Sequence, residues 1–265
     1  MEHAGPRSNR RDFAAATFAL LLPSLITWLY FYRAAGASPA VQLAVFNVVK
    51  VLQFAFPLVW ALAVERQRLA WRPPHGRGVA FGLAFGAAVG AATLGLYYGF
   101  LQDRKLLAAA SGEISAKVQG WGLQYVWQYV ALGVFYSLLH ALLEEYYWRW
   151  FVFGRLRRGL AADAEHLAGR GAAPGRASEA GVRLGAAIAL SSLGFMAHHV
   201  LVLGKYFGFG SPATWFFSGC VAAGGAVWAW LYHRTGSLLG PWLSHLLVDA
   251  AIFWVGYDLL RGVLR

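Results

Sequence analysis

Apolar residues run through most of this chain in long segments, which short polar stretches separate. A transmembrane helix needs about 20 mostly apolar residues to cross roughly 30 Å of hydrocarbon. By that measure the pattern predicts an all-α, polytopic membrane bundle of seven spans, with an eighth hidden in a long or re-entrant segment as the alternative. The seven predicted spans are residues 13–32, 41–64, 79–101, 125–153, 184–203, 215–232 and 237–257.

The composition supports a membrane protein. Of the residues, 58% are hydrophobic and 13% are charged, whereas a soluble domain has about 25% charged residues. Aromatic residues make up 16% of the chain, and many stand near predicted span ends, where amphipathic rings prefer the headgroup region. Cys220 is the single cysteine, so an internal disulfide is excluded.

The formal net charge of +11 follows the loops rather than a single surface. A nucleic-acid-binding protein needs its basic residues on a water-exposed face, so we expect no nucleic-acid partner. Because cytoplasmic loops carry the excess of Lys and Arg, the charges place the N-terminus in the cytoplasm. The segments placed inside carry Arg7, Arg10, Arg11, Arg66, Arg68, Arg72, Arg77, Arg155, Arg157, Arg158, Arg170, Arg176 and Arg183. Arginine outnumbers lysine among the basic residues, which is typical of a GC-rich and therefore prokaryotic genome. We therefore expect a protein of the bacterial inner membrane, in contact with membrane lipids.

The chain is expected to form one membrane domain over residues 1–265. The spans within residues 1–122 carry no recognisable motif, residues 123–259 form the expected core, and residues 154–183 are predicted to be a flexible basic loop. Two rows of small residues at a spacing of four predict close helix packing, with dimerisation as the lesser option. These rows are Gly82, Gly86 and Gly90, and Gly219, Ala223 and Val227.

A few ionisable residues lie inside the predicted spans, where each is costly and is therefore a candidate for function. They are Lys50, His140, Glu144, Glu145, Arg149, His198, His199, His245 and Asp249. No motif surrounds Lys50, which either snorkels to the interface or pairs with an acid. The remaining residues fall on the fourth, fifth and seventh spans.

Helical spacing assigns different directions to the two acids of the fourth span. Glu145 and Arg149 share a face as an i, i+4 pair, whereas Glu144 points about 100° away. His245 and Asp249 share a face in the same manner. On helix geometry, Glu144 and His245 lie about 12–13 Å from the same membrane face. His199 reaches that depth if the fifth span begins near residue 190, so the three spans can meet at one level.

Three motifs in this order on separate spans resemble the signature of the CAAX-protease and bacteriocin-processing family of intramembrane proteases, which includes the prenyl-protein CAAX protease. The motifs are Glu144-Glu145-x-x-x-Arg149, Phe195-x-x-x-His199 and His245-x-x-x-Asp249. The resemblance covers about 105 residues. It implies a helical core that encloses a water-accessible intramembrane cavity, and it implies hydrolysis of peptide bonds.

The resemblance also implies roles for the motif residues. Glu144 would be the general base, and His199 would help to hold the attacking water. His245 and Asp249 would stabilise the oxyanion, although an ionised Asp249 only accepts hydrogen bonds and can instead orient His245. Glu145 and Arg149 would be structural. His140, Phe195 and His198 are candidates for positions around these groups.

The family's proteases are described both as metal-dependent and as glutamate-based. We favour a mechanism without a metal cofactor, because the sequence has no H-E-x-x-H helix. The alternative is a catalytic Zn²⁺ held by Glu144, His199 and His245, since such a site needs three protein ligands and an open position.

A membrane-anchored protein or peptide is the expected substrate. Bacterial relatives such as the group called myxosortases are associated with the removal of C-terminal anchoring tails, and the composition is compatible with that group. Two other functions fit a polar cluster inside a membrane. The first is a transporter that relays protons or binds a cation, and the second is a bacteriocin-immunity or scaffold protein.

Overall fold

The computed structural model describes residues 6–67, 76–102, 107–168 and 176–265, and this part of the chain contains helices and no strands. Seven helical segments are long and apolar enough to cross a membrane, which confirms the predicted all-α polytopic bundle. They are Arg11–Arg33, Pro39–Val64, Gly76–Leu101, Val126–Ala161, Glu179–Phe207, Pro212–Thr235 and Leu239–Leu260. Arg68, Arg72 and Arg170, which were named among the cytoplasmic arginines, lie outside the described residues.

Several spans contain a π-helical segment, so their elements carry separate labels. In chain order they are α1 (Pro6–Trp28), η1 (Leu29–Arg33), α2 (Pro39–Val59), η2 (Trp60–Val64), α3 (Gly76–Leu96), η3 (Tyr97–Leu101), α4 (Ala108–Gly120), α5 (Val126–Phe135), η5 (Tyr136–His140), α6 (Ala141–Glu145), η6 (Tyr146–Phe153), α7 (Gly154–Ala168), α8 (Arg176–Phe207), α9 (Pro212–Thr235) and α10 (Leu239–Leu260).

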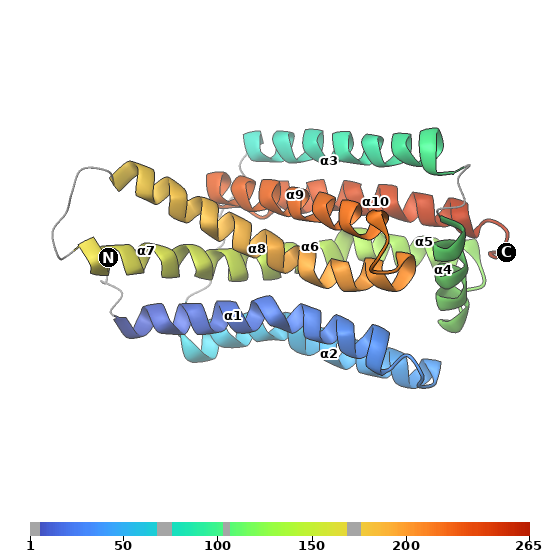
Figure 1. The fold of residues 1–265 in the computed structure, drawn as a ribbon, viewed down its shortest axis with the longest axis horizontal. Helices are drawn as coiled ribbons and strands as arrows, with labels where there is room; N and C mark the ends of the chain where they lie inside the picture. Colours follow the sequence, from blue (N-terminus) through green and yellow to red (C-terminus); the bar gives the residue numbers. More distant parts are fainter. Residues whose placement is uncertain (1–5, 68–75, 103–106, 169–175) are drawn as a thin grey trace.

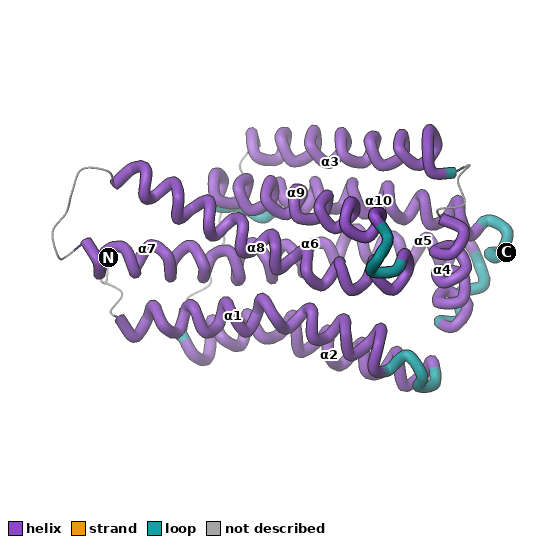
Figure 2. Tube along the Cα trace, viewed as in Figure 1, coloured by secondary structure: helices purple, strands orange, loops and turns teal. Residues whose placement is uncertain are grey.

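The spanning helices lie side by side along the long axis, with α1 and α2 on one flank and α3 on the other (Figure 1). The start of α1 and the C-terminus lie at opposite ends of this axis. The short helix α4 lies across the end nearest the C-terminus, nearly perpendicular to the spans. Figure 2 shows short loops at this end between η1 and α2 and between α8 and α9. The molecule is therefore a bundle of roughly parallel helix axes with one helix across one end.

The fourth span is one continuous helical rod from α5 to α7. Its central α-helical segment, α6, is only five residues long and lies between two π-helical segments, η5 and η6. Single π-helical turns inside α-helices occur frequently at functional sites, because they change the direction in which side chains point. The segment α6 ends in Glu144 and Glu145.

Glycines allow α3 and α10 to approach until their backbones touch. A Cβ atom at Gly82 would collide with the backbone of Gly240, and one at Gly86 would lie 2.7 Å from the Ser244 carbonyl oxygen. The packing predicted for this row is confirmed. The prediction for the second row is wrong, because Gly219 has no heavy atom within 4 Å of an added Cβ and faces outward.

The prediction of a flexible loop over residues 154–183 also differs from the structure. Helix α7 continues the fourth span to Ala168, and α8 begins at Arg176. Buried Arg155 stabilises the first turns of α7, since its guanidinium lies 3.3 Å from Asp12 Oδ1 and 2.7 Å from Glu65 Oε2. Pairing with distant carboxylates is not visible as apolar periodicity, so the sequence alone suggested a loop.

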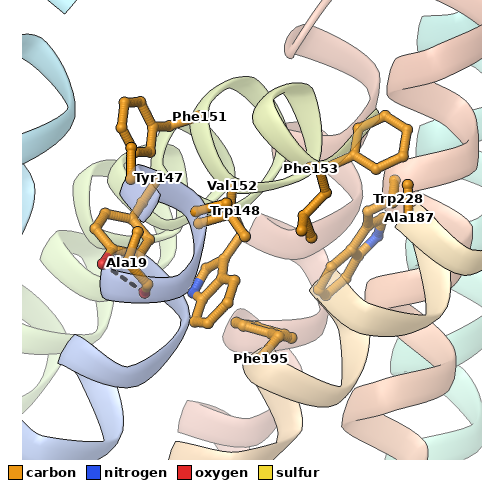
Figure 3. Packing of buried hydrophobic residues seen from close by; sticks show 13 residues of the cluster. Ala19, Tyr147, Trp148, Phe151, Val152, Phe153, Ala187, Phe195 and Trp228 are labelled. Atoms are coloured by element: carbon orange, nitrogen blue, oxygen red, sulfur yellow. Dashed lines mark hydrogen bonds between the residues drawn. The ribbon is translucent and has the colours of Figure 1, made fainter. Parts of the chain in front are cut away.

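The largest buried cluster surrounds η6 and contacts α1, α8 and α9 (Figure 3). Trp148 and Phe151 are fully buried there, and the Tyr147 hydroxyl donates a hydrogen bond of 2.7 Å to the carbonyl oxygen of Ala19. Phe195 from α8 and Trp228 from α9 complete the cluster on the side of the ionisable residues. This packing fixes the rotation of the fourth span about its own axis.

Candidate active site

Glu145 and Arg149 form the expected pair inside the bundle. Arg149 Nε lies 3.0 Å from Glu145 Oε2, and both side chains have no solvent exposure. The guanidinium carbon of Arg149 lies 4.9 Å from the Phe195 ring centroid and 5.4 Å from that of Trp228. The cation is therefore held by a carboxylate and by two aromatic rings, an arrangement that suits a delocalised guanidinium.

Glu144 faces a different set of partners, as its position on the helix predicted. Its carboxylate is buried and lies among three imidazole rings from three spans. The Nε2 atoms of His140 and His198 are 3.9 Å and 3.8 Å from Oε1, and Nε2 of His245 is 3.8 Å from Oε2. These separations exceed direct hydrogen-bond lengths, so the carboxylate is surrounded by imidazoles and has no short bond to any of them.

His245 connects the two acids of α6. Its Nδ1 lies 2.9 Å from Glu145 Oε1, and because an ionised carboxylate only accepts, Nδ1–H is the donor. Its Nε2 points toward Glu144 Oε2 and lies 3.6 Å from Asp249 Oδ1. Trp228 stacks on the ring at a centroid distance of 4.3 Å. The imidazole is therefore fixed in position by a hydrogen bond and an aromatic face.

The two adjacent histidines of α8 occupy different environments. His198 is buried, stacks on Trp148 at 5.6 Å and is the one of the pair whose ring nitrogen lies near Glu144. His199 is half-buried, and its Nδ1 donates a 2.9 Å hydrogen bond to the carbonyl oxygen of Phe195. This bond explains the spacing of four in the Phe195 motif, and it leaves Nε2 of the neutral ring as an acceptor.

The structure adds residues that the sequence did not single out. Trp228 donates a 2.9 Å hydrogen bond to Ser244 Oγ while it stacks on His245. Tyr136 lies 4.7 Å, ring to ring, from His140. Phe54 of α2 contacts the same imidazole at 5.7 Å. Aromatic residues are abundant in this chain, so only their places in the fold distinguish these three.

Lys50 belongs to the same region. Its ammonium lies 5.8 Å and 5.5 Å from the ring centroids of Phe46 and Phe54, and Phe54 in turn contacts His140. The motif-free N-terminal spans therefore contribute a cation and an aromatic ring beside the imidazoles.

A metal ion would need three protein ligands and an open position at this site. Within the described ranges, no three His, Cys, Asp or Glu side chains are arranged to hold a metal ion. Of the set Glu144, His199 and His245, the first and last meet at 3.8 Å, and His199 has its Nδ1 on the Phe195 carbonyl oxygen, which leaves its Nε2 as the ring nitrogen open to a ligand. We derive no chemical step through a metal.

Comparison with known proteins supports the resemblance that the motifs carry. Residues 126–251 match the family model described as Type II CAAX prenyl endopeptidase Rce1-like. Neither a curated protein nor a solved structure matches the chain. The matched segment begins at the first residue of α5, ends within α10, and contains all three motifs.

Proposed function

We propose, from the match of residues 126–251 to the Rce1-like family of type II CAAX prenyl endopeptidases, that the chain is an intramembrane protease of this kind and that Glu144 activates the water that hydrolyses the peptide bond. The observation that carries the proposal is the position of the Glu144 carboxylate, buried within a membrane bundle among three imidazoles. A carboxylate positioned beside a water molecule can act as a general base toward it.

In the proposed reaction, Glu144 takes a proton from water while the oxygen attacks the scissile carbonyl carbon. The proton then passes to the leaving amine as the carbon–nitrogen bond breaks, so Glu144 returns to its ionised form. The free Nε2 of His199 accepts a hydrogen bond from the same water and fixes its direction. His198, between Trp148 and Glu144, holds the carboxylate in place.

His245 supplies the proposed stabilisation of the oxyanion. Its ring has carboxylates on both sides, Glu145 at Nδ1 and Asp249 and Glu144 at Nε2. In the proposed reaction the ring acts as an imidazolium, which donates from both nitrogens. A preorganised donor at the position of developing negative charge contributes strongly to catalysis. Asp249 orients the ring, and the pair of Glu145 with Arg149 holds it at the required depth.

We further propose that the enzyme needs no metal cofactor and that it acts on a membrane-anchored protein or peptide. The proposed location is a bacterial inner membrane with the N-terminus in the cytoplasm, because the excess of arginine falls on that side. The transporter and scaffold alternatives have no feature in their favour that the family match does not already explain.

The experiment that tests this function uses cells that lack the protein. We expect one membrane-anchored protein to accumulate in an unprocessed form in these cells. The wild-type chain should restore processing, whereas Glu144→Gln, expressed at the same level, should not. Restoration by Glu144→Gln would overturn the role of Glu144, and the absence of any accumulating precursor in the membrane proteome would overturn the proposed class of substrate.

A further inference from the structure

A second polar site lies at the end of the bundle where α4 crosses the spans. A cavity of about 240 Å³ opens there between η1, α2, α4 and the end of α8. Its lining includes Tyr30, Phe31, Gln42, Lys117, Trp121 and Lys205. Lys205 follows His198 by seven positions on α8, a rise of about 10 Å. This cavity is therefore separate from the proposed catalytic cluster, which comprises His140, Glu144, Glu145, Arg149, His198, His199, His245 and Asp249.

Lys117 of α4 is held in the cavity by aromatic rings. Its ammonium lies 4.1 Å from the ring centroid of Tyr30, 5.4 Å from Phe31 and 5.7 Å from Trp121. It donates a hydrogen bond of 3.3 Å to Gln42 Oε1. No ion pair joins it to a carboxylate of the described residues. Burial, and to a smaller degree the nearby Lys205, lowers the pKa of Lys117. The cavity therefore contains an oriented cation that lacks an anionic partner.

The charges of the cavity do not balance. Lys205 adds a second ammonium, and Glu113 faces it at 3.5 Å from Oε2 to Nζ. Two lysines and one glutamate leave one positive charge. A ligand with a single negative charge would neutralise the site, and such a ligand would also relieve the repulsion between the two ammonium groups.

The surroundings of the cavity indicate the source of that anion. Helix α4 lies across the ends of the helices that are long and apolar enough to cross a membrane (Figure 1). The ends of such helices lie at the level of the lipid headgroups. Tyr and Trp side chains, such as those of Tyr30, Tyr206 and Trp121, are typical of this level. Trp28 and Val41 lie on α1 and α2 at the same end and are 42% and 51% exposed, so an acyl chain can lie against them.

From this combination we infer that the cavity binds the headgroup phosphate of an anionic phospholipid. A phosphodiester carries one negative charge and accepts hydrogen bonds from both lysines. A choline headgroup is disfavoured, because its quaternary ammonium would compete with Lys117 for the face of Tyr30. The site is independent of the proposed catalytic roles, since none of its lining residues belongs to the catalytic cluster.

The test measures the thermal stability of the full-length protein in uncharged detergent micelles at increasing concentrations of phosphatidylglycerol. We expect a saturable rise in Tm with phosphatidylglycerol and none with phosphatidylcholine. Lys117→Gln and Lys205→Gln should each raise the apparent Kd for phosphatidylglycerol about fivefold. Arg261→Gln is the matched control, because it removes an exposed cation that pairs with Asp258 near the same end of the bundle, and it should leave the Kd unchanged.

A second variant keeps the proposal testable if either lysine variant fails to fold. Glu113 is exposed, so Glu113→Gln preserves packing while it removes the competing carboxylate, and it should tighten the binding of phosphatidylglycerol. A Kd that is the same for Lys117→Gln, Glu113→Gln and the wild type would overturn the site. An equal rise in Tm with inorganic phosphate alone would show a free-anion site instead of a lipid site. Stabilisation by a short acidic peptide, but not by the lipid, would overturn it in favour of a peptide carboxylate.

Discussion

At the scale of single residues, the two acids of the proposed catalytic cluster, Glu144 and Glu145, differ in how closely their partners approach. Glu145 has two short contacts, with Arg149 at 3.0 Å and His245 at 2.9 Å, and it is fully buried. Glu144 has three partners at 3.8–3.9 Å and no short contact. A charge that is fully paired supports the structure, whereas a buried charge with loose partners is able to change partners during a reaction.

The first prediction concerns the pair of Glu145 with Arg149. Arg149→Ala should lower the free energy of unfolding by about 3–5 kcal/mol, because it leaves a buried carboxylate with one partner fewer. Arg183→Ala is the control. It breaks an i, i+4 pair with Glu179 whose side chains are 34% and 66% exposed, so the expected cost is below about 1 kcal/mol. Unfolding of both variants in the same detergent tests this, and equal losses would contradict it.

The second prediction separates the two adjacent histidines. His199→Gln should lower kcat by about 10²-fold or more while Tm stays close to that of the wild type, because the side chain is half-buried and is assigned to the water. His198→Gln should lower both kcat and Tm, since this ring is buried against Trp148. Measurement of kcat and Tm for the two purified variants tests this prediction. A loss of stability in His199→Gln alone would reverse the assignment.

At the scale of elements, the position of α10 depends on the glycines of α3. Gly82 and Gly86 let the backbone of α3 touch α10 at Gly240 and Ser244, and Ser244 precedes His245. A side chain on α3 at these positions would therefore push the His245 imidazole, the proposed oxyanion donor, away from Glu144. Glycines far from any motif thus help to set the distance between His245 and Glu144.

The third prediction follows from this contact. Gly86→Ala places a Cβ 2.7 Å from the Ser244 carbonyl oxygen, so the helices must separate. A displacement of about 1 Å at a catalytic group can cost about 10²-fold in rate, and we expect kcat to fall by about tenfold or more. Gly95→Ala, in the same helix and with no atom within 4 Å of the new Cβ, should leave kcat unchanged. Equal activity of the two variants would show that α3 does not position His245.

Some of these element-level features follow from the sequence and others do not. The pairs Glu145–Arg149 and His245–Asp249 were predictable, because both partners lie on one helix and the spacing of four fixes their proximity. The contact of His198 with Glu144 and the stacking of Trp228 on His245 were not, since each depends on how two helices rotate and shift against each other. The Phe195 motif signalled His199 and gave no sign of the role of His198.

At the scale of the whole molecule, the seven spans were predicted from apolar run length alone, because hydrocarbon thickness sets that length. Helix α4 was missed, since its 13 residues are too short and too polar to register as a span. The helical continuation into α7 was missed because distant carboxylates neutralise Arg155. The sequence therefore predicts what the bilayer dictates, and misses what depends on contacts between distant segments.

The fourth prediction concerns metal content. Purified, active enzyme should contain far less than one zinc ion per chain, and dialysis against a chelator should leave its activity unchanged, because the proposed water activation depends on Glu144 rather than on a Lewis acid. Elemental analysis of the same sample before and after dialysis measures both quantities. Stoichiometric zinc that is lost together with activity would contradict this prediction.

The most direct test of the mechanism is the cleavage rate of the purified protein, reconstituted in lipid vesicles with its accumulating substrate. Glu144→Gln should reduce the rate by about 10²–10⁴-fold with a Tm equal to that of the wild type. Glu179→Gln, which removes an exposed carboxylate, should cleave at the wild-type rate. If correctly folded Glu144→Gln cleaves the substrate as fast as the wild type, Glu144 is not the base and the proposed mechanism is wrong.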